Sequence, residues 1–571
     1  MSVVLSEHLP LLASAPEGIQ KLRGLILELA VRGKLVPQDP DDEPASELLK
    51  RISLERARLE VSTPRKKGGQ TPHVRESERP FALPDGWEWS RIGELSSVVR
   101  GVSYDKSQSS ENQLYGYLPL LRGHNINQHL KFDDLVFVPE KLVSNEQRIR
   151  RGDIVIAMSS GSAHLVGKAA QAENDINFGF GAFCGLIRSH STELHPYFGF
   201  FFQTPQYRNR VAGHGKGIGI NNLQKGALLD LECPIPPLAE QHRIVAKVDE
   251  LMALCDRLEA EQADADAAHA KLVNTLLGTL TQSTDAADLA ANWQRLAEHF
   301  DTLFTTEASL DALKQTILQL AVMGKLVPQD PNDEPASELL KRIAKERVRL
   351  EAEGVCKKPK AMPPIEKNDG PFELPSGWAW ARFPEIGLFG RGKSKHRPRN
   401  DPALFNPGIY PLVQTGEVAR AGTIIREFHS RYSETGLNQS KMWPQGTLCI
   451  TIAANIADSA ILGFEACFPD SVVGFIPSPF LGGSRYFLSF MKTVREELLR
   501  FAPSTAQKNI NLEILESVRI PLPPKAEMER IVAKVDELMA LCDRLKADLA
   551  ESRARQARLS ATLIETALRA A

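Results

Sequence analysis

One stretch of the sequence formally matches a phosphate-binding loop. Residues Gly387 to Ser394 read GLFGRGKS, which fits the pattern GxxxxGK followed by Ser or Thr. In a phosphate-binding loop this pattern follows a buried strand and opens a helix whose first N–H groups hold the phosphate. Here Pro384 interrupts the approach, and Pro398 and Pro402 follow, so no helix is expected. Nucleotide binding is therefore not predicted.

Other patterns that could carry chemistry are also incomplete. The glycine-rich run Gly213 to Gly219 (GHGKGIG) follows a helical pattern, whereas a dinucleotide-binding loop follows a strand. Asn406 to Tyr410 (NPGIY) is only weakly similar to the DPPY-type loop of adenine methyltransferases. There is no HExxH or GxSxG motif, and the seven cysteines form no CxxC pair. We therefore expect no catalytic residues, no cofactor and no metal, and the chain is predicted not to be an enzyme.

The composition is that of an ordinary globular protein. Lys and Arg number 69 against 71 Asp and Glu, which gives a formal net charge of −2. This balance excludes a uniformly basic nucleic-acid binder but leaves room for local basic patches. The start, MSVVLSEHLP, lacks the features of a signal peptide, and no apolar run reaches membrane-spanning length. We expect a cytoplasmic location.

Two stretches of the chain are present twice. Residues 32–52 and 323–343 share GKLVPQDPxDEPASELLKRI, and residues 244–258 and 531–545 both read IVAKVDELMALCDRL. The segments between the copies share the spacing of a few short motifs but little sequence. Internal repeats must be settled before any other assignment of fold. A chain that duplicates its scaffold while its inserts diverge is expected to present two different recognition surfaces in one fixed geometry.

The repeated stretches predict helices. Apolar residues recur at helical spacing in 19–31 and again in 310–322. Longer helices are expected after the proline-rich junctions PIPPLAEQ and PLPPKAEM. There, apolar residues recur in alternating steps of four and three residues, which is the spacing of a heptad seam. We expect the two long helices to pair with each other as an antiparallel two-helix coiled coil; the alternative is that each packs separately on its neighbouring insert. The seam residues are Ile244, Val248, Leu251, Cys255 and Leu258, with Ile531, Val535, Leu538, Cys542 and Leu545.

The inserts change character to short β-rich segments. LPDGWEWSRI at 83–92 and LPSGWAWARF at 374–383 mark equivalent entries. Short apolar runs punctuated by Gly, Pro and Asn then predict strands, and each insert closes with an aromatic helix, at 197–211 and 486–501. The expected fold class is α+β and multidomain. Two mixed α/β, β-rich domains are separated by the long antiparallel coiled coil, with pseudo-two-fold symmetry.

With these features the chain resembles the specificity subunit of type I restriction–modification systems. The resemblance rests on the twin GKLVPQDPxDEPASELLKRI blocks, the LPxGWxW entries and the proline-rich exits into KVDELMALCDRL. It covers nearly the whole chain. It implies five parts: N-terminal helices and linker (1–80), a first target recognition domain (81–235), a central helical spacer and linker (236–370), a second target recognition domain (371–522) and a C-terminal coiled-coil helix (523–571).

The resemblance also implies a function and partners. Each target recognition domain would read one half of a bipartite, asymmetric site in double-stranded DNA. The repeated helices would dock two modification (adenine methyltransferase) subunits, which restriction (translocase and nuclease) subunits then join, with no membrane involved. Two rival functions remain open: a self-sufficient DNA methyltransferase or nuclease, and a coiled-coil adaptor that binds proteins. Methyl transfer by the chain alone, or weak DNA affinity with the partner bound, would distinguish them.

Polar residues at strand ends and in loops of the inserts are the candidates for DNA contact. Arg suits guanine, Asn or Gln suits adenine, Glu suits cytosine, and Lys or Arg suits phosphates. The alternatives are turns and helix caps at the strand ends, a flexible connector before each proline exit, and a solvated loop for the basic run. The candidates are Arg100, Tyr104, Lys106, Arg122, His124, Asn125, Asn127, Lys216, Asn221, Asn222, Arg391, Lys393, Lys395, Arg397, Gln414, Thr415, Glu417, Gln507, Lys508 and Asn509.

Overall fold

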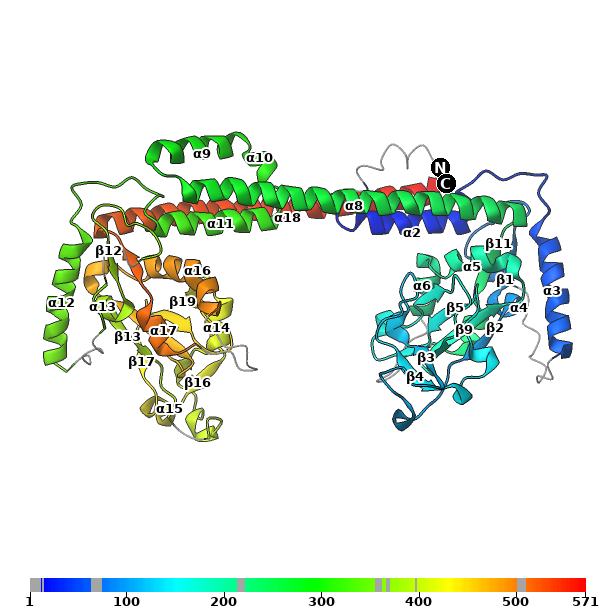
Figure 1. The fold of residues 1–571 in the computed structure, drawn as a ribbon, viewed down its shortest axis with the longest axis horizontal. Helices are drawn as coiled ribbons and strands as arrows, with labels where there is room; N and C mark the ends of the chain where they lie inside the picture. The colour runs from blue at the N-terminus through cyan, green and yellow to red at the C-terminus, as the bar shows by residue number, and fades with distance from the viewer. Residues whose placement is uncertain are drawn as a thin grey trace. The chain divides into compact units, whose positions relative to one another are not determined.

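The computed structural model divides the chain into two compact units. It describes residues 12, 15–62, 74–212, 221–354, 362–365, 370–395, 398–500 and 510–570. Unit 1 comprises Met1–Asp264 and Ser552–Ala571, and unit 2 comprises Ala265–Glu551. Each unit combines a helical scaffold with one β-rich domain (Figure 1). No helix among the described residues is long and apolar enough to cross a membrane.

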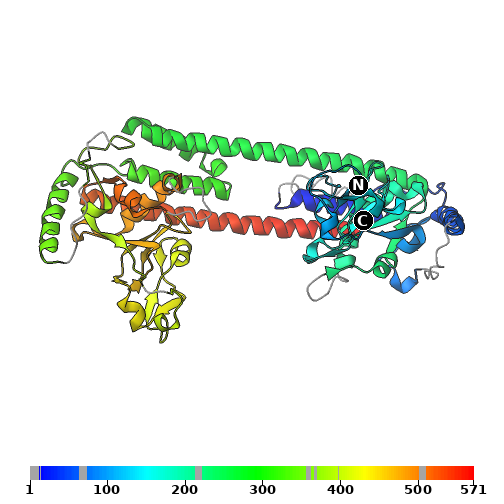
Figure 2. The same cartoon turned by 60° about the horizontal axis from the view of Figure 1, so that its bottom comes forward.

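Two long helices run through both units. Helix α8 (Leu238–Gln282) begins in unit 1 and ends in unit 2, whereas α18 (Lys525–Ala570) begins in unit 2 and ends in unit 1. Figures 1 and 2 show both as unbroken helices. The remaining scaffold helices are α2 (Gly18–Val31) and α3 (Ala45–Ser62) in unit 1, and α9 (Ala286–Glu298), α10 (Phe300–Leu303), α11 (Glu307–Val322) and α12 (Ala336–Ala352) in unit 2.

The β-rich domain of unit 1 contains a four-stranded and a three-stranded sheet. The first has the order β2 (Ser96–Arg100), β9 (Cys184–Ser189), β5 (Ile154–Ala157), β7 (Ala169–Gln171), and the second β4 (Val136–Pro139), β3 (Tyr117–Leu121), β8 (Gly179–Phe180). Two further strand pairs are β1 (Glu88–Arg91) with β11 (Glu232–Ile235), and β6 (Ser159–Ser160) with β10 (Asn221–Asn222). Its helices are α4 (Ile92–Leu95), α5 (His195–Phe201), α6 (Pro205–Ala212) and α7 (Lys225–Leu229).

The β-rich domain of unit 2 repeats this plan. Its five-stranded sheet has the order β13 (Gly387–Arg391), β21 (Val472–Pro477), β18 (Leu448–Thr451), β19 (Ser459–Leu462), β15 (Ile424–Ile425). A four-stranded sheet has the order β16 (Ser430–Tyr432), β14 (Tyr410–Leu412), β20 (Ala466–Cys467), β17 (Met442–Trp443), and β12 (Ala379–Ala381) pairs with β22 (Ile520–Leu522). Its helices are α13 (Phe383–Ile386), α14 (Thr415–Arg420), α15 (Glu434–Asn438), α16 (Arg485–Arg500) and α17 (Leu512–Ser517).

The central strands are apolar on both faces because each face meets a different core. In β5, Ile154 and Ile156 belong to the core shared with the scaffold helices, whereas Val155 and Ala157 belong to a second core with strand β3. Successive side chains of a strand point to opposite faces of the sheet, which produces this alternation. Strand β18 divides its residues in the same way between two cores of unit 2. The sheet is therefore fixed against its scaffold on one side.

The expected class of two β-rich α/β domains separated by a long helix is confirmed. The two long helices contribute to both cores in opposite directions, but their twin seams lie in different cores. Ile244, Val248, Leu251 and Cys255 are buried in the unit 1 core with α2. In the unit 2 core with α11, Ile531, Val535 and Cys542 are buried and Leu538 is partly buried. Between the cores, residues 259–268 of α8 (EAEQADADAA) are exposed. This stretch offers only small and polar side chains, so the seam cannot continue through it.

Each seam instead packs beside the short helix of its own unit. In unit 1, the guanidinium of Arg23 on α2 lies 2.6 Å from the carboxylate of Asp256 on α8. In unit 2, the Nζ of Lys546 on α18 lies 3.1 Å from the carboxylate of Asp311 on α11. The end of the other long helix completes each core, through Ala567 in unit 1 and Val273 in unit 2. The six described cysteines are free and buried, while Cys356 lies outside the described residues.

Candidate nucleic-acid interface

Each β-rich domain joins its long helix through the same buried contact. The indole N–H of Trp87 donates to Oε2 of Glu240 at 2.9 Å, and that of Trp378 donates to Oε2 of Glu527 at 3.0 Å. Both tryptophans come from the LPxGWxW entries, and both glutamates lie in the first turn of a long helix. Acidic side chains are favoured at a helix N-terminus. The repeated residues thus hold two different domains in the same way.

The chain reversal at this joint requires glycine. Gly33 and Gly324 have φ of 68° and 67°, a conformation that L side chains rarely adopt. A Cβ at Gly324 would lie 2.5 Å from Cγ of Pro375 and 2.9 Å from the ring of Trp378. The tryptophan therefore packs directly on the glycine backbone, and the glycine of each repeated block is needed for that close approach.

Burial raises the pKa of both glutamates at the joint. It is the largest effect on Glu240 and on Glu527, and the indole hydrogen bond from Trp87 or Trp378 opposes it. A raised pKa means that the folded chain holds this proton more tightly than the unfolded chain. Above its folded-state pKa, the ionised carboxylate therefore lowers the free energy of unfolding, which is a cost to stability. That cost is relieved as the pH falls through the folded-state pKa towards the ordinary value of 4.5.

Replacing Glu527 by Gln should remove this pH dependence. We expect the melting temperature of Glu527→Gln minus that of the unsubstituted chain to be most positive at pH 7.5 and to decrease towards pH 4.5. Thermal melts across that range check the trend. Glu529→Gln, two residues along the same helix at an exposed position, is the matched control and should show no such trend. A difference for Glu527→Gln that stays constant or grows on acidification would contradict the assignment.

The first strand of each main sheet ends in an exposed arginine. Arg100 is the last residue of β2, and Arg391 is the last residue of β13. Lys393 and Lys395 follow Arg391 as exposed residues, while Arg397 lies outside the described residues. Lys106 is also exposed, and Tyr104 packs against a small core around Val102. Because Gly387–Arg391 is a strand and no helix occurs in the described residues up to 395, the formal phosphate-loop match is a sheet edge.

The polar residues after β3 and β14 mainly stabilise turns. Oδ1 of Asn125 accepts the backbone N–H of Arg122 at 2.8 Å, and Oε2 of Glu417 accepts that of Gln414 at 3.0 Å. Asn125 is fully buried and donates to the carbonyl of Asp133 at 2.8 Å. These contacts favour the capping alternative for Asn125 and Glu417. A side chain committed to a buried backbone partner is not available to a base edge.

The other residues of these two turns remain more accessible. Arg122 donates to the Asp134 carbonyl at 2.7 Å. His124 is exposed, and the amide of Asn127 donates to its carbonyl at 3.2 Å. Gln414 is exposed and its amide lies 3.3 Å from the Ser430 hydroxyl, while Thr415 is half-buried. Arg122, His124 and Gln414 therefore keep polar atoms at the surface.

The loop before each proline-rich junction ends in a backbone hydrogen bond to the segment that follows a central strand, at equivalent positions in the two domains. The N–H of Leu223 donates to the carbonyl of Met158 after β5, and the N–H of Ile510 donates to that of Ile452 after β18, at 2.7 and 2.9 Å. Asn222 is exposed and accepts a hydrogen bond from Ser159 at 2.7 Å. Asn221 pairs with Ser160 in the strand pair β6–β10. Outside the described residues lie Lys216, Gln507, Lys508 and Asn509.

Unit 1 has a polar pocket of about 520 Å³ beside Arg100. Ser159, Asn222, Gln224 and Lys225 also contribute to its wall. Sequence reasoning identified Arg100 and Asn222 but missed Ser159, Gln224 and Lys225. The polar run NNLQK just before a short helix was the signal that could have indicated them. The pocket joins two of the predicted candidates with three donors that the sequence alone did not connect.

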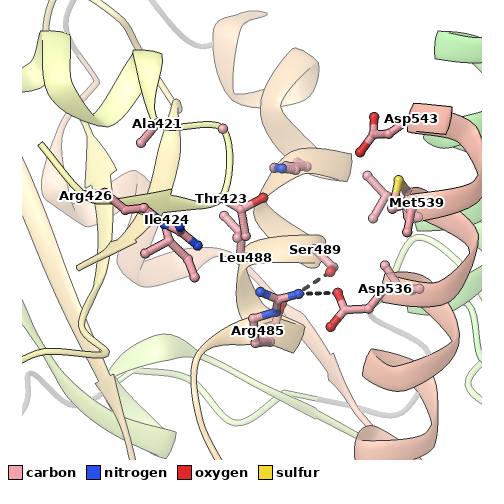
Figure 3. A pocket seen from close by; sticks show the side chains of 15 residues that line it. Ala421, Thr423, Ile424, Arg426, Arg485, Leu488, Ser489, Asp536, Met539 and Asp543 are labelled. Carbon is pink, nitrogen blue, oxygen red and sulfur yellow. Dashed lines mark hydrogen bonds and ion pairs between the residues drawn. The ribbon is translucent and has the colours of Figure 1, made fainter. Parts of the chain in front are cut away.

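A second pocket, of about 620 Å³, lies in unit 2 between the β-rich domain and α18 (Figure 3). Arg485 forms an ion pair with Asp536 across it. Lys492 also lines it, and its pKa is lowered by burial and then by the charges of Arg485 and Lys314. No cysteine or histidine is among the described residues of its wall. The arrangement is one of ion pairs between domain and scaffold.

The sequence matches one family along both halves. The sequence model of the type I restriction modification DNA specificity domain matches residues 84–265 and again residues 375–552. The EcoAI specificity subunit of Escherichia coli is 37% identical over 580 residues, covering 96% of this chain and 94% of that protein. The EcoEI specificity subunit of Escherichia coli is 35% identical with the same two coverages, 96% and 94%.

Solved structures give a further likeness. The HsdS subunit from Thermoanaerobacter tengcongensis is 19% identical, with a TM-score of 0.40, covering 86% of this chain and 98% of that one. The family match spans more than half of the chain, and the two curated relatives align with nearly all of it. The chain therefore belongs to the family of type I restriction–modification specificity subunits, whose members are not enzymes, and the expectation that it performs no catalysis of its own is confirmed.

Proposed function

We propose that each β-rich domain reads one half of a bipartite, asymmetric site in double-stranded DNA. The recognition domains are taken to be residues 81–235 and 371–522. The repeated helices dock two modification (adenine methyltransferase) subunits, and restriction subunits join that complex in the cytoplasm. The modification subunits then methylate an adenine in each half-site after rotating it out of the duplex.

The observation that carries this proposal is a repeated scaffold with divergent polar residues at the strand ends. Trp87–Glu240 and Trp378–Glu527 form the same joint at 2.9 and 3.0 Å. At the turns after β3 and β14, however, Arg122 in one domain corresponds to Gln414 in the other. Arg and Gln prefer different base edges in the major groove. Equivalent frames with different side chains are what two unlike half-sites require.

The long helices supply the separation between the readers. Helix α8 has 45 residues and α18 has 46. At ~1.5 Å per residue each helix is roughly 68 Å long, whereas one turn of DNA is roughly 34–36 Å. A continuous helix does not shorten or bend as a flexible linker does. The length of α8 and α18 therefore determines how many unread base pairs lie between the half-sites.

Mapping methylated adenines across a genome tests the proposal directly. The chain would be expressed with its modification subunits in a host without other adenine methylation, and methylated positions would be read by long-read sequencing. We expect one two-part motif with unequal halves and a constant gap. A single uninterrupted motif, or methylation without any sequence preference, would contradict the proposal. Expression of the modification subunits without this chain is the control and should give no motif.

A further inference from the structure

Arg100 and Arg391 occupy the same position in the two β-rich domains. Arg100 lies opposite Gly185, the second residue of β9, and Arg391 lies opposite Val473, the second residue of β21. In both domains the next N–H donates to the first residue of that partner strand, from Gly101 to Cys184 and from Gly392 to Val472. The register therefore aligns the two arginines residue for residue, although the surrounding sequences differ.

The glycine after each arginine is required by a close backbone approach. A Cβ at Gly101 would lie 2.0 Å from the carbonyl oxygen of Gly181. A Cβ at Gly392 would lie 2.1 Å from the carbonyl oxygen of Phe468. Real Cβ atoms do not approach a carbonyl so closely, so no other residue fits without a shift of the backbone. The Arg–Gly pair thus fixes where the strand ends and where the arginine projects.

Both arginines are exposed, and neither guanidinium has an ion pair or hydrogen bond within the described part of the chain. Another repeated arginine behaves differently. Arg91 and Arg382, just before α4 and α13, are 6% and 7% exposed. Arg91 donates to the carbonyl of Asp230 at 2.6 Å, and Arg382 donates to the carbonyl of Pro363 at 2.9 Å. Arg91 and Arg382 therefore have a structural role in their own domains, whereas Arg100 and Arg391 are left to meet a partner.

We propose that Arg100 and Arg391 bind DNA phosphates at equivalent places and position each domain on the duplex without reading a base. This inference rests on the proposed DNA-reading function. The part of DNA that two domains can contact in the same way, whatever sequence each reads, is the phosphate backbone. The residue shared at this register is Arg, whose planar guanidinium suits bidentate phosphate binding. The divergent Arg122 and Gln414 are left to distinguish bases.

Equilibrium binding by the complex of this chain with its modification subunits tests the role. Fluorescence anisotropy would be measured at several salt concentrations. The duplexes would carry either the motif found by methylation mapping or the same motif with one substituted base pair. Arg100→Ala and Arg391→Ala should each weaken binding to all of these duplexes by about tenfold. Each should also reduce the slope of log affinity against log salt by about one. The ratio between the correct and the substituted duplexes should not change.

Controls separate this inference from the function on which it rests. Arg295→Ala removes one exposed charge from helix α9 and should leave the salt slope unchanged. Arg100→Lys should retain the slope, because it keeps the charge. If the unsubstituted complex shows no sequence preference, the proposed function fails. If it does show preference, but Arg100→Ala and Arg391→Ala behave like Arg295→Ala or lose discrimination at one base pair, phosphate positioning is wrong.

Discussion

Lengthening both long helices by one heptad is expected to abolish methylation of the original site and to favour sites with a longer gap. Seven residues of Ala, Glu and Lys would be inserted after Asp264 in α8 and after Glu551 in α18, where the chain passes between units. Seven helical residues add about 10.5 Å, which corresponds to at most about three base pairs of 3.4 Å. A heptad is close to two full turns, so the buried faces keep their orientation.

Genome-wide mapping of methylated adenine measures the change. The two half-site sequences should remain the same, since neither β-rich domain is altered. Replacing residues 261–267 by the same segment without a change of length is the matched control, because all of them are exposed. It should leave the gap unchanged. An unaltered gap in the double insertion would mean that the helices do not determine the spacing.

Replacing Trp378 by Ala is expected to destabilise the joint of unit 2 by about 3–5 kcal/mol. The indole is 8% exposed and packs on Gly324, so its removal leaves a cavity. The buried carboxylate of Glu527 also loses the hydrogen bond from the indole N–H. Trp378→Phe keeps most of the packing and should cost about 1–3 kcal/mol, the cost of an unsatisfied buried group.

Hydrogen exchange localises this effect within a chain of two units. The amides of β12 and β22 should lose protection in the Trp378 variants, while those of β1 and β11 in unit 1 serve as an internal reference. Trp380→Phe is the matched control, because Trp380 is also 8% exposed but its indole N–H has no hydrogen-bond partner among the described residues. It should change protection little. Equal losses in Trp378→Phe and Trp380→Phe would show that the hydrogen bond to Glu527 contributes nothing.

The duplicated scaffold could be predicted because its information is local. Heptad spacing from Ile244 and from Ile531 identified the long helices, and the LPxGWxW entries located the start of each β-rich domain. The proline-rich junctions likewise preceded the observed starts of α8 and α18. Such patterns depend on neighbours within a few turns of one element. The positions of the long helices and the class of fold follow from them, whereas the single helix predicted at 197–211 is divided into α5 and α6.

The partners of those elements were decided by the tertiary structure. Periodicity shows that Ile244 and Val248 face something apolar, but it cannot tell a twin seam from α2, which lies more than 200 residues earlier in the sequence. The same holds for the polar residues. Asn125 and Gln414 looked alike as candidates for base contact, yet the backbone N–H of Arg122 engages Asn125 while Gln414 stays exposed. A sequence determines which groups a residue carries, whereas the fold decides which of those groups already have a partner.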